Sequence, residues 1–232
     1  MRITPGLSVV VTGAASGIGR ALTRRLVARG CNVAGIDRQD SDDGPSAATL
    51  WITADVSHPD DIEAAAARVA AAWGSTHLLI NCAGLYLQGR IAEQDPAAAR
   101  RLLDVNIGGV LWSCRAFLPG MIAARRGHVV NLSSIYGRIG SAGRSTYCAT
   151  KWAIAGFSES LRAEVEEHGI RVTCVYPAAV RTAIVAQGTF TNPSQRAFEQ
   201  TALQTMGLEP DTVASAILRA VRRDVERLRI GW

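Results

Sequence analysis

Aromatic residues, histidines and paired cysteines are all scarce in this sequence. Only 6% of its 232 residues are aromatic while 48% are hydrophobic, so Ala, Val, Ile and Leu must build the core. Such a composition suits a parallel sheet covered by helices. The five cysteines are scattered without a CxxC pair, which predicts reduced thiols in a cytoplasmic protein rather than a disulfide framework. The four histidines are dispersed, so we expect no metal site.

Long hydrophobic runs are also missing. Residues 1–20 lack the basic start and apolar stretch of a signal peptide, and no run approaches about 18 apolar residues, so we expect no membrane span. The net charge of +5 raises the question of nucleic acid. The densest basic run, residues 219–229, is interleaved with Asp224 and Glu226. We interpret it as a solvated helix face and expect no nucleic-acid partner.

Lysine is almost absent, because every one of the 25 basic residues except Lys151 is arginine. Lys151 follows Tyr147 by four residues, a spacing that puts both side chains on one face of a helix. A nearby ammonium favours the phenolate and would lower the pKa of a tyrosine. The spacing therefore indicates an acid–base pair, although a surface Tyr–Lys pair would have the same spacing.

Short apolar runs alternate with helical patterns from end to end. We predict strands at 7–12, 31–37, 50–54, 78–81, 128–132, 171–176 and 227–232, and helices that include 20–29, 95–126 and 146–168. This alternation predicts a single doubly wound α/β domain over residues 1–232, with a parallel sheet of about seven strands. Residues 37–49 are poor helix material, so the crossover there should be little more than a loop.

A glycine-rich stretch, TGAASGIG, separates the first strand from the first helix. Gly13, Gly17 and Gly19 would let the backbone approach a pyrophosphate at the helix N-terminus. The context of strand, turn and helix favours a dinucleotide site, and a purely structural tight turn is the alternative.

The end of the second strand bears on the choice of cofactor. Asp37 lies 18 residues after Gly19, where a carboxylate can bind the adenosine ribose hydroxyls and would repel a 2′-phosphate. Arg38 follows at once and could instead hold that phosphate. Because neighbouring strand residues point to opposite faces, only one of the two should face the ribose squarely. Since Ser16 occupies the place in the glycine loop where a basic residue could sit, NAD is favoured over NADP.

With these motifs the sequence resembles a compact short-chain dehydrogenase/reductase from about residue 7 to residue 230. The matching motifs are TGAASGIG (12–19), ADV (54–56), NCAG (81–84), LDVNIGG (103–109), LSSIYG (132–137), YCATK (147–151) and YPAAVRT (176–182). Two positions depart from the family pattern, Cys82 for the second Asn of NNAG and Ala178 for the usual Gly. Both affect cofactor packing more than chemistry.

The resemblance implies a Rossmann fold and NAD(P)-dependent oxidoreduction of a secondary alcohol or ketone. It implies that the catalytic residues are Asn106, Ser134, Tyr147 and Lys151. Lys151 would lower the pKa of Tyr147, and Asn106 would hold a relay water. The cofactor residues implied are Gly13, Ser16, Gly17, Ile18, Gly19, Asp37, Arg38, Asp55, Val56, Asn81, Ala83, Gly84, Tyr147, Lys151, Pro177, Ala178, Val180 and Thr182.

Other readings of these residues stay open. Ser133 and Ser134 could simply end a strand, and Cys148 is more typical of a small buried residue than of a nucleophile. Asn106 is a poor helix former, which suggests a role other than helix formation. A nucleotide-sensing regulatory protein on the same scaffold is the alternative function, and its mark would be a lost Ser, Tyr or Lys.

The sequence does not identify the substrate. Specificity should come from Leu85–Arg90, from Ile135–Arg144 and from a substrate loop at about 183–207. Arg138 and Arg144 could face an acidic substrate, although solvent-exposed arginines are the favoured interpretation. Apolar positions on the helices at 95–126 and 146–168 predict an exposed patch and hence a homodimer or homotetramer.

Overall fold

Seven parallel strands form the central sheet of the computed structural model, which describes residues 1–39 and 48–231. The sheet order is β3-β2-β1-β4-β6-β7-β9. The strands are β1 (Ser8–Thr12), β2 (Asn32–Asp37), β3 (Leu50–Thr53), β4 (Leu78–Asn81), β6 (Gly127–Leu132), β7 (Ile170–Pro177) and β9 (Arg227–Ile230). The predicted seven-stranded, doubly wound sheet is confirmed. The predicted loop crossover at 37–49 falls mostly on residues 40–47, outside the described residues.

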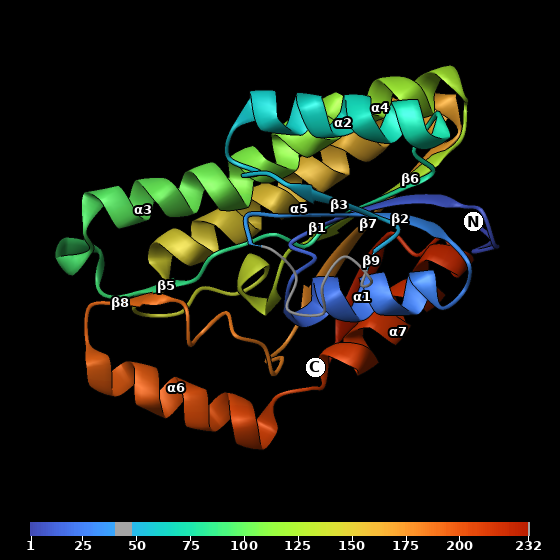
Figure 1. Cartoon of the computed structure of the whole chain (residues 1–232). Helices are drawn as coiled ribbons and strands as arrows, with labels where there is room; N and C mark the ends of the chain where they lie inside the picture. The colour runs from blue at the N-terminus through green and yellow to red at the C-terminus, as the bar shows by residue number, and fades with distance from the viewer. Residues whose placement is uncertain (40–47, 232) are drawn as a thin grey trace.

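Helices cover both faces of this sheet (Figure 1). α1 (Gly17–Val27) and α7 (Pro210–Arg223) pack on one face, and α2 (Pro59–Trp73), α4 (Gly109–Ala123) and α5 (Ser145–Val165) pack on the other. The alternation along β1 explains the two layers, since successive side chains point to opposite faces. Val10 packs with residues of α2, α4 and α5, whereas Val9 and Val11 pack with residues of α1 and α7.

The two long helices predicted from the sequence are interrupted in different ways. The helix predicted at 95–126 consists of α3 (Pro96–Leu103), a π-helical turn (Asp104–Gly108) and α4. The helix predicted at 146–168 is α5 followed by a 3₁₀ turn (Glu166–His168). Further 3₁₀ turns lie at Ile91–Glu93 and Ile135–Gly137.

The predicted substrate loop at 183–207 is largely ordered secondary structure. It contains β8 (Thr189–Phe190), which pairs with β5 (Leu87–Gln88), and the helix α6 (Pro193–Met206). Asn192 caps α6 by accepting a hydrogen bond from the Ser194 N–H, and Pro193 occupies its first turn. Both are ordinary helix-start signals, so much of the segment expected as the substrate loop is helical.

The basic run at 219–229 is also not one helix face. α7 ends at Arg223, with Asp224 in the left-handed region at a φ of +52°, and Arg227 and Arg229 belong to β9. Only the first part of the run is therefore helical.

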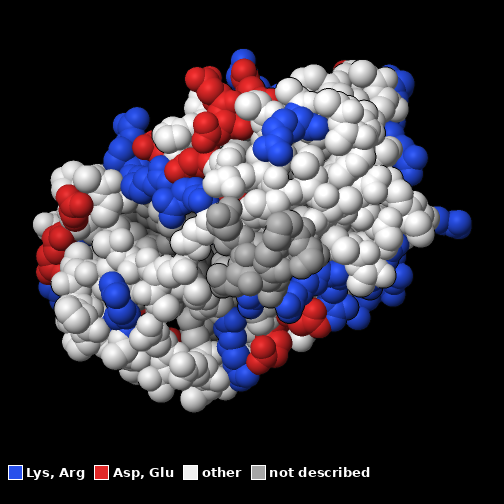
Figure 2. Space-filling model, in the orientation of Figure 1, with Lys and Arg blue, Asp and Glu red and all other residues white. Residues whose placement is uncertain are grey.

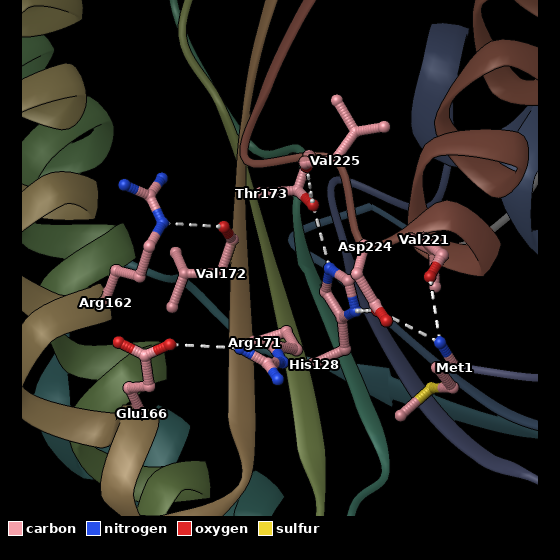
Figure 3. Close-up of polar contacts among 10 residues, drawn as sticks. All are labelled: Met1, His128, Arg162, Glu166, Arg171, Val172, Thr173, Val221, Asp224 and Val225. Atoms are coloured by element: carbon pink, nitrogen blue, oxygen red, sulfur yellow. Dashed lines mark hydrogen bonds and ion pairs between the residues drawn. The ribbon is translucent and has the colours of Figure 1, made fainter.

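A group of polar contacts joins the amino ends of β6 and β7 to α7 and α5 (Figure 3). The buried His128 contacts the Thr173 hydroxyl at 2.8 Å, and this hydroxyl donates to the Val225 carbonyl at 2.7 Å. Arg162 Nε donates to the Val172 carbonyl at 3.4 Å. These contacts lie at the end of the sheet away from the glycine loop.

No helix among the described residues is long and apolar enough to cross a membrane.

Candidate active site

A cleft of about 400 Å³ lies at the carboxyl edge of the sheet. Loops that follow β1, β2, β3, β4, β6 and β7 line it, as expected for a ligand site of a doubly wound sheet. Eighteen of the twenty residues predicted for the site are among its lining residues. They are Gly13, Ser16, Gly17, Ile18, Gly19, Asp37, Arg38, Asp55, Val56, Ala83, Gly84, Ser134, Tyr147, Lys151, Pro177, Ala178, Val180 and Thr182.

The glycine loop forms a cradle that side chains would fill. Gly13 and Gly17 have φ values of +68° and +52°, which favour glycine. A Cβ at Gly19 would lie 2.0 Å from the Gly13 carbonyl oxygen, and one at Gly13 would lie 2.8 Å from the Ala83 backbone. The loop leads into α1, whose N-cap residue Ser16 makes no side-chain capping bond. Backbone and helix N-terminus are thus arranged as a pyrophosphate requires, so these residues fit a dinucleotide.

Thr12, which was not predicted as a site residue, holds the glycine loop against the turn after β4. Its hydroxyl oxygen accepts the N–H groups of Cys82 and Ala83, at 3.2 and 3.3 Å, and so joins the end of β1 to the turn after β4. The sequence signal was available, because Thr12 is the first residue of the TGxxxGxG motif.

Asp37 and Arg38 both line the cleft, contrary to the expectation that alternation would turn one of them away. The reason is that β2 ends at Asp37, so Arg38 no longer follows the strand pleat. Asp37 is partly buried and accepts hydrogen bonds from the N–H groups of Ala15 and Gln39, at 3.0 and 3.2 Å. Arg38 is exposed. The carboxylate is therefore fixed at the glycine loop.

Asp55 has a structural partner that the sequence did not indicate. Arg101, from α3, approaches one carboxylate oxygen to 2.5 Å, while Ser57 donates to the other from its N–H and hydroxyl. Burial raises the pKa of Asp55, but the bonds from Ser57 and Arg101 outweigh it and lower this pKa to about 2. The carboxylate is thus ionised and held in place where Asp55 and Val56 line the cleft.

Ser134, Tyr147 and Lys151 meet at the other end of the cleft. Ser134 follows β6, its hydroxyl oxygen accepts the Tyr136 N–H at 3.2 Å, and its hydroxyl also bonds the Tyr147 hydroxyl. Tyr147 and Lys151 lie one turn apart near the start of α5, with the Lys151 ammonium 5.6 Å from the centre of the Tyr147 ring. All three side chains are buried, the hydroxyl of Ser134 beside that of Tyr147.

Burial governs the protonation of this group. It raises the pKa of Tyr147, and the hydrogen bond with Ser134 offsets only part of the rise. Burial also lowers the pKa of Lys151 to about 8. The resemblance implied a lowered pKa for the tyrosine, but in the structure Lys151 Nζ donates to the Leu132 carbonyl at 3.1 Å and sits over the ring. At neutral pH the phenol is therefore protonated.

Asn106 and Asn81 are the two predicted residues that do not line the cleft. Asn106 lies in the π-helical turn, where its amide binds the Leu85 backbone on both sides, accepting at 2.7 Å and donating at 3.1 Å. Asn81 donates to the Asn131 amide oxygen at 2.8 Å, and Asn131 donates to the Ser158 hydroxyl at 3.0 Å. Both asparagines thus hold the frame of the site, Asn106 beneath the turn after β4 and Asn81 within the sheet.

Apolar and aromatic side chains surround Tyr147 at the mouth of the cleft. All three segments expected to set specificity contribute here: Leu85, Tyr86, Ile135, Tyr136, Arg144, Ile184, Val185, Gln187, Phe198, Glu199, Ala202, Leu203 and Met206. Tyr86 and Tyr136 meet the Tyr147 ring edge-on, with centroids 4.9 and 6.1 Å away. Arg144 is paired with Glu199 instead of being open to a ligand. Arg138 lies over the Tyr176 ring and is not among the lining residues.

Comparison with known proteins agrees with this geometry. Residues 8–193 match the family model described as short chain dehydrogenase. SadH of Mycobacterium tuberculosis is 33% identical over an alignment of 241 residues that covers 97% of this chain and 86% of that protein. The 3-alpha-(or 20-beta)-hydroxysteroid dehydrogenase of Mycobacterium bovis is 35% identical over 182 residues, covering 76% of this chain and 70% of that protein.

Solved structures give the same picture. A short-chain dehydrogenase/reductase from Burkholderia phymatum in complex with NAD superposes with a TM-score of 0.90 at 25% identity, covering 99% of this chain and 90% of that one. The backbone that carries the cleft is therefore similar in fold to a short-chain dehydrogenase/reductase solved with NAD.

Proposed function

Because this chain belongs to the short-chain dehydrogenase/reductase family, we propose that it interconverts a secondary alcohol and its ketone with NAD(H). The observation that carries the proposal is the convergence of Ser134, Tyr147 and Lys151 at one end of a cleft whose other end is the glycine cradle. A hydroxysteroid dehydrogenase among the relatives supports a secondary alcohol as substrate.

Three side chains divide the protein's part of the reaction. When substrate is bound, Ser134 donates its hydroxyl proton to the substrate oxygen and holds the carbonyl beside Tyr147. The phenol, protonated because its pKa is raised, delivers a proton to that oxygen during ketone reduction and takes it back during alcohol oxidation. Bound NAD(H) supplies or accepts the hydride. The Lys151 ammonium stabilises the phenolate left behind by proton transfer.

Asn106 positions Ser134, Tyr147 and Lys151 indirectly, by holding the backbone beside them. By holding both polar groups of Leu85, it fixes the turn after β4, and its amide also donates to Thr150 at 3.2 Å, next to Lys151. We assign Asn106 a positioning role, with the relay water implied by the family resemblance as its further task.

The fixed Asp37 carboxylate supports NAD over NADP. It lines the cleft at the end of β2 and would repel a 2′-phosphate, while the neighbouring Arg38 is exposed. Replacing Asp37 by Ala removes this repulsion and leaves Arg38 available. We expect kcat/KM to favour NADH over NADPH in the wild type and to shift towards NADPH in the variant. A wild type that prefers NADPH would reverse the assignment.

The regulatory alternative has no support at the site, since Ser134, Tyr147 and Lys151 are all present and lie together. The two functions differ in turnover, so absorbance at 340 nm with a panel of ketones separates them.

Replacing Tyr147 by Phe tests the mechanism. We expect turnover to fall at least ~10²-fold, with NADH affinity nearly unchanged, because the lost hydroxyl acts only in proton transfer. Tyr176→Phe is the matched control, since it removes the hydroxyl of a buried tyrosine that does not line the cleft. Equal turnover in the two variants would refute the role of Tyr147.

Replacing Lys151 by Arg keeps the charge but enlarges the head group. We expect a large loss of turnover, because the buried site holds a compact ammonium bonded to the Leu132 carbonyl. Turnover close to wild type would show that charge alone is sufficient at this position.

A further inference from the structure

Helix α6 is attached to the rest of the molecule by few side chains. In Figure 1 it lies apart from the layers that cover the sheet. None of its 14 residues is buried, and only Glu199, Gln200, Ala202 and Leu203 are partly buried. Arg196 bonds the Gly188 carbonyl, within the same segment. A helix with so little apolar contact depends strongly on its polar contacts to keep its position.

One cluster provides such contacts. Glu199 accepts a hydrogen bond from the Tyr86 hydroxyl at 2.6 Å and forms an ion pair with Arg144, whose Nε donates to the same hydroxyl at 2.7 Å. Among the described residues, these are the side-chain hydrogen bonds that α6 makes outside its own segment. The Arg144 and Glu199 side chains are 17% and 12% exposed, so solvent screens the pair weakly.

The same cluster reaches the catalytic tyrosine. Tyr86 meets the Tyr147 ring edge-on at 4.9 Å, and Arg144 lies 5.1 Å from the centre of the Tyr136 ring, which also contacts Tyr147. Leu203, one turn beyond Glu199, packs against the apolar cluster that includes Tyr86 and Tyr147. A shift of Glu199 would therefore move both aromatic walls of the substrate site.

The cluster also sets the charge of the site. Near Tyr147 the charged residues that line the cleft are Lys151, Arg144 and Glu199, and the last two neutralise each other. The remaining lining there is mainly apolar: Leu85, Ile135, Ile184, Val185, Phe198, Ala202, Leu203 and Met206. In Figure 2 the surface over α6 and β8 is mostly free of charged side chains. Among the described residues that line this part of the cleft, an anionic substrate would find no unpaired arginine.

We propose that Tyr86, Arg144 and Glu199 form a latch that holds α6 over Tyr147 and restricts the enzyme to uncharged, apolar ketones and alcohols. This inference rests on the proposed function, because the substrate site is that of the same reaction. The three are positioning and specificity residues, and proton transfer stays with Tyr147. Apart from Arg144, which the sequence suggested as a contact for an acidic substrate, the latch was not predicted.

A matched pair of ketones tests the charge selection. Methyl para-acetylbenzoate and para-acetylbenzoate share one aryl ketone and differ in the charge of the distant group. We expect a higher kcat/KM for the ester in the wild type. In Glu199→Gln the guanidinium of Arg144 loses its counter-charge, and the ratio of acid to ester should rise ~10-fold or more. In the double variant Arg144→Gln/Glu199→Gln the ratio should fall back towards the wild type.

Glu63→Gln is the control, because it removes a carboxylate from an exposed Glu63–Arg115 pair that does not line the cleft. Its acid-to-ester ratio should equal that of the wild type. A ratio unchanged in Glu199→Gln, while the wild type reduces the ester and Tyr147→Phe does not, would overturn the latch and leave the proposed function standing.

Hydrogen exchange tests the latch without turnover. Amides of residues 193–206 should exchange faster in Glu199→Gln than in the wild type, whereas Glu63→Gln should leave their exchange unchanged. Equal exchange in all three proteins would overturn the latch. If the wild type turned over neither ketones nor alcohols with either cofactor, the proposed function would fail, and the exchange data would still decide whether Glu199 anchors α6.

Discussion

At Lys151 the size of the head group matters as much as its charge. The side chain is 5% exposed, and its Nζ lies 3.7 Å from where a Cβ on Gly84 would be. An arginine there would need partners for five N–H donors in a space that serves one ammonium. Burial also lowers the pKa of Lys151 to about 8, a value that lets it exchange protons, whereas a guanidinium stays charged. The small space and the need for proton exchange together account for a lysine at this position in a sequence whose other basic residues are all arginine.

His128 makes the folded protein sensitive to acid. The Thr173 hydroxyl donates to Val225, so it must accept from Nε2–H of His128, and the ring is held neutral (Figure 3). Burial lowers the pKa of His128 to about 4, with opposing influence from Asp224 and additional lowering by the Met1 ammonium and Arg171. The unfolded ring binds its proton near pH ~6.5, so stability from this residue is lost as pH falls below that value.

We therefore expect unfolding free energy to fall by about 2 kcal/mol between pH 7 and pH 5 through His128 alone. His128→Gln keeps an N–H donor but does not titrate, so its loss over the same range should be smaller by that amount. Urea unfolding at both pH values measures the difference. Parallel losses in the two proteins would contradict the assignment.

At the scale of the elements, the glycine loop was predictable and α6 was not. The loop could be predicted from one motif, because each of its glycines is required locally, either by a positive φ or by the close approach of another backbone or side-chain atom. The segment 183–207 lacks a buried stripe, so its apolar residues show no clear helical period, although Asn192 and Pro193 mark its start. The π-helical turn at Asn106 could not be predicted from local sequence either, because Asn106 bonds the backbone of Leu85, which belongs to a different segment of the chain.

The loop gives a test of the dinucleotide site. Gly19→Ala would place a Cβ 2.0 Å from the Gly13 carbonyl oxygen, so the loop must open and the cradle is lost. We expect NADH affinity to fall at least ~10²-fold, since the loop backbone supplies the pyrophosphate contacts. Fluorescence titration with NADH measures this. Gly140→Ala is the control, because a Cβ there meets nothing within 4 Å and its binding should not change.

At the scale of the whole molecule, the layers were predictable and the outer surface only partly so. Alternating strands and helices predict one parallel sheet with helices on both faces, and the structure has this arrangement. The apolar residues of the helices predicted at 95–126 and 146–168 indicated an exposed patch, but most of them belong to the core. Leu102, Val105, Val110, Phe117, Ile154 and Leu161 are buried in the chain's own core, Ile107, Leu111 and Phe157 are half-buried, and Trp152 is 53% exposed. Periodicity cannot tell core from interface, because both demand apolar side chains.

The homodimer through α4 and α5 remains a prediction, now centred on Trp152. Trp152→Glu should yield monomers at micromolar concentration, because a two-fold axis would bring the new charge against its own copy. Light scattering after size-exclusion chromatography measures the mass. Ile91→Glu, at a side chain that is 68% exposed on the turn Ile91–Glu93, should keep the wild-type assembly. A wild-type monomer would refute the prediction directly.

The single lysine has a practical consequence for chemical labelling. Acylating reagents and lysine crosslinkers that act on ε-amines find one such group in the chain, and it is buried beside Tyr147. Crosslinking with these reagents therefore cannot trap surface contacts between copies through lysines. A small acylating reagent that enters the cleft would instead mark Lys151 as the one ε-amine, apart from the α-amine of Met1, so the extent of its modification, read by mass spectrometry, would report whether the end of the cleft at Tyr147 is covered.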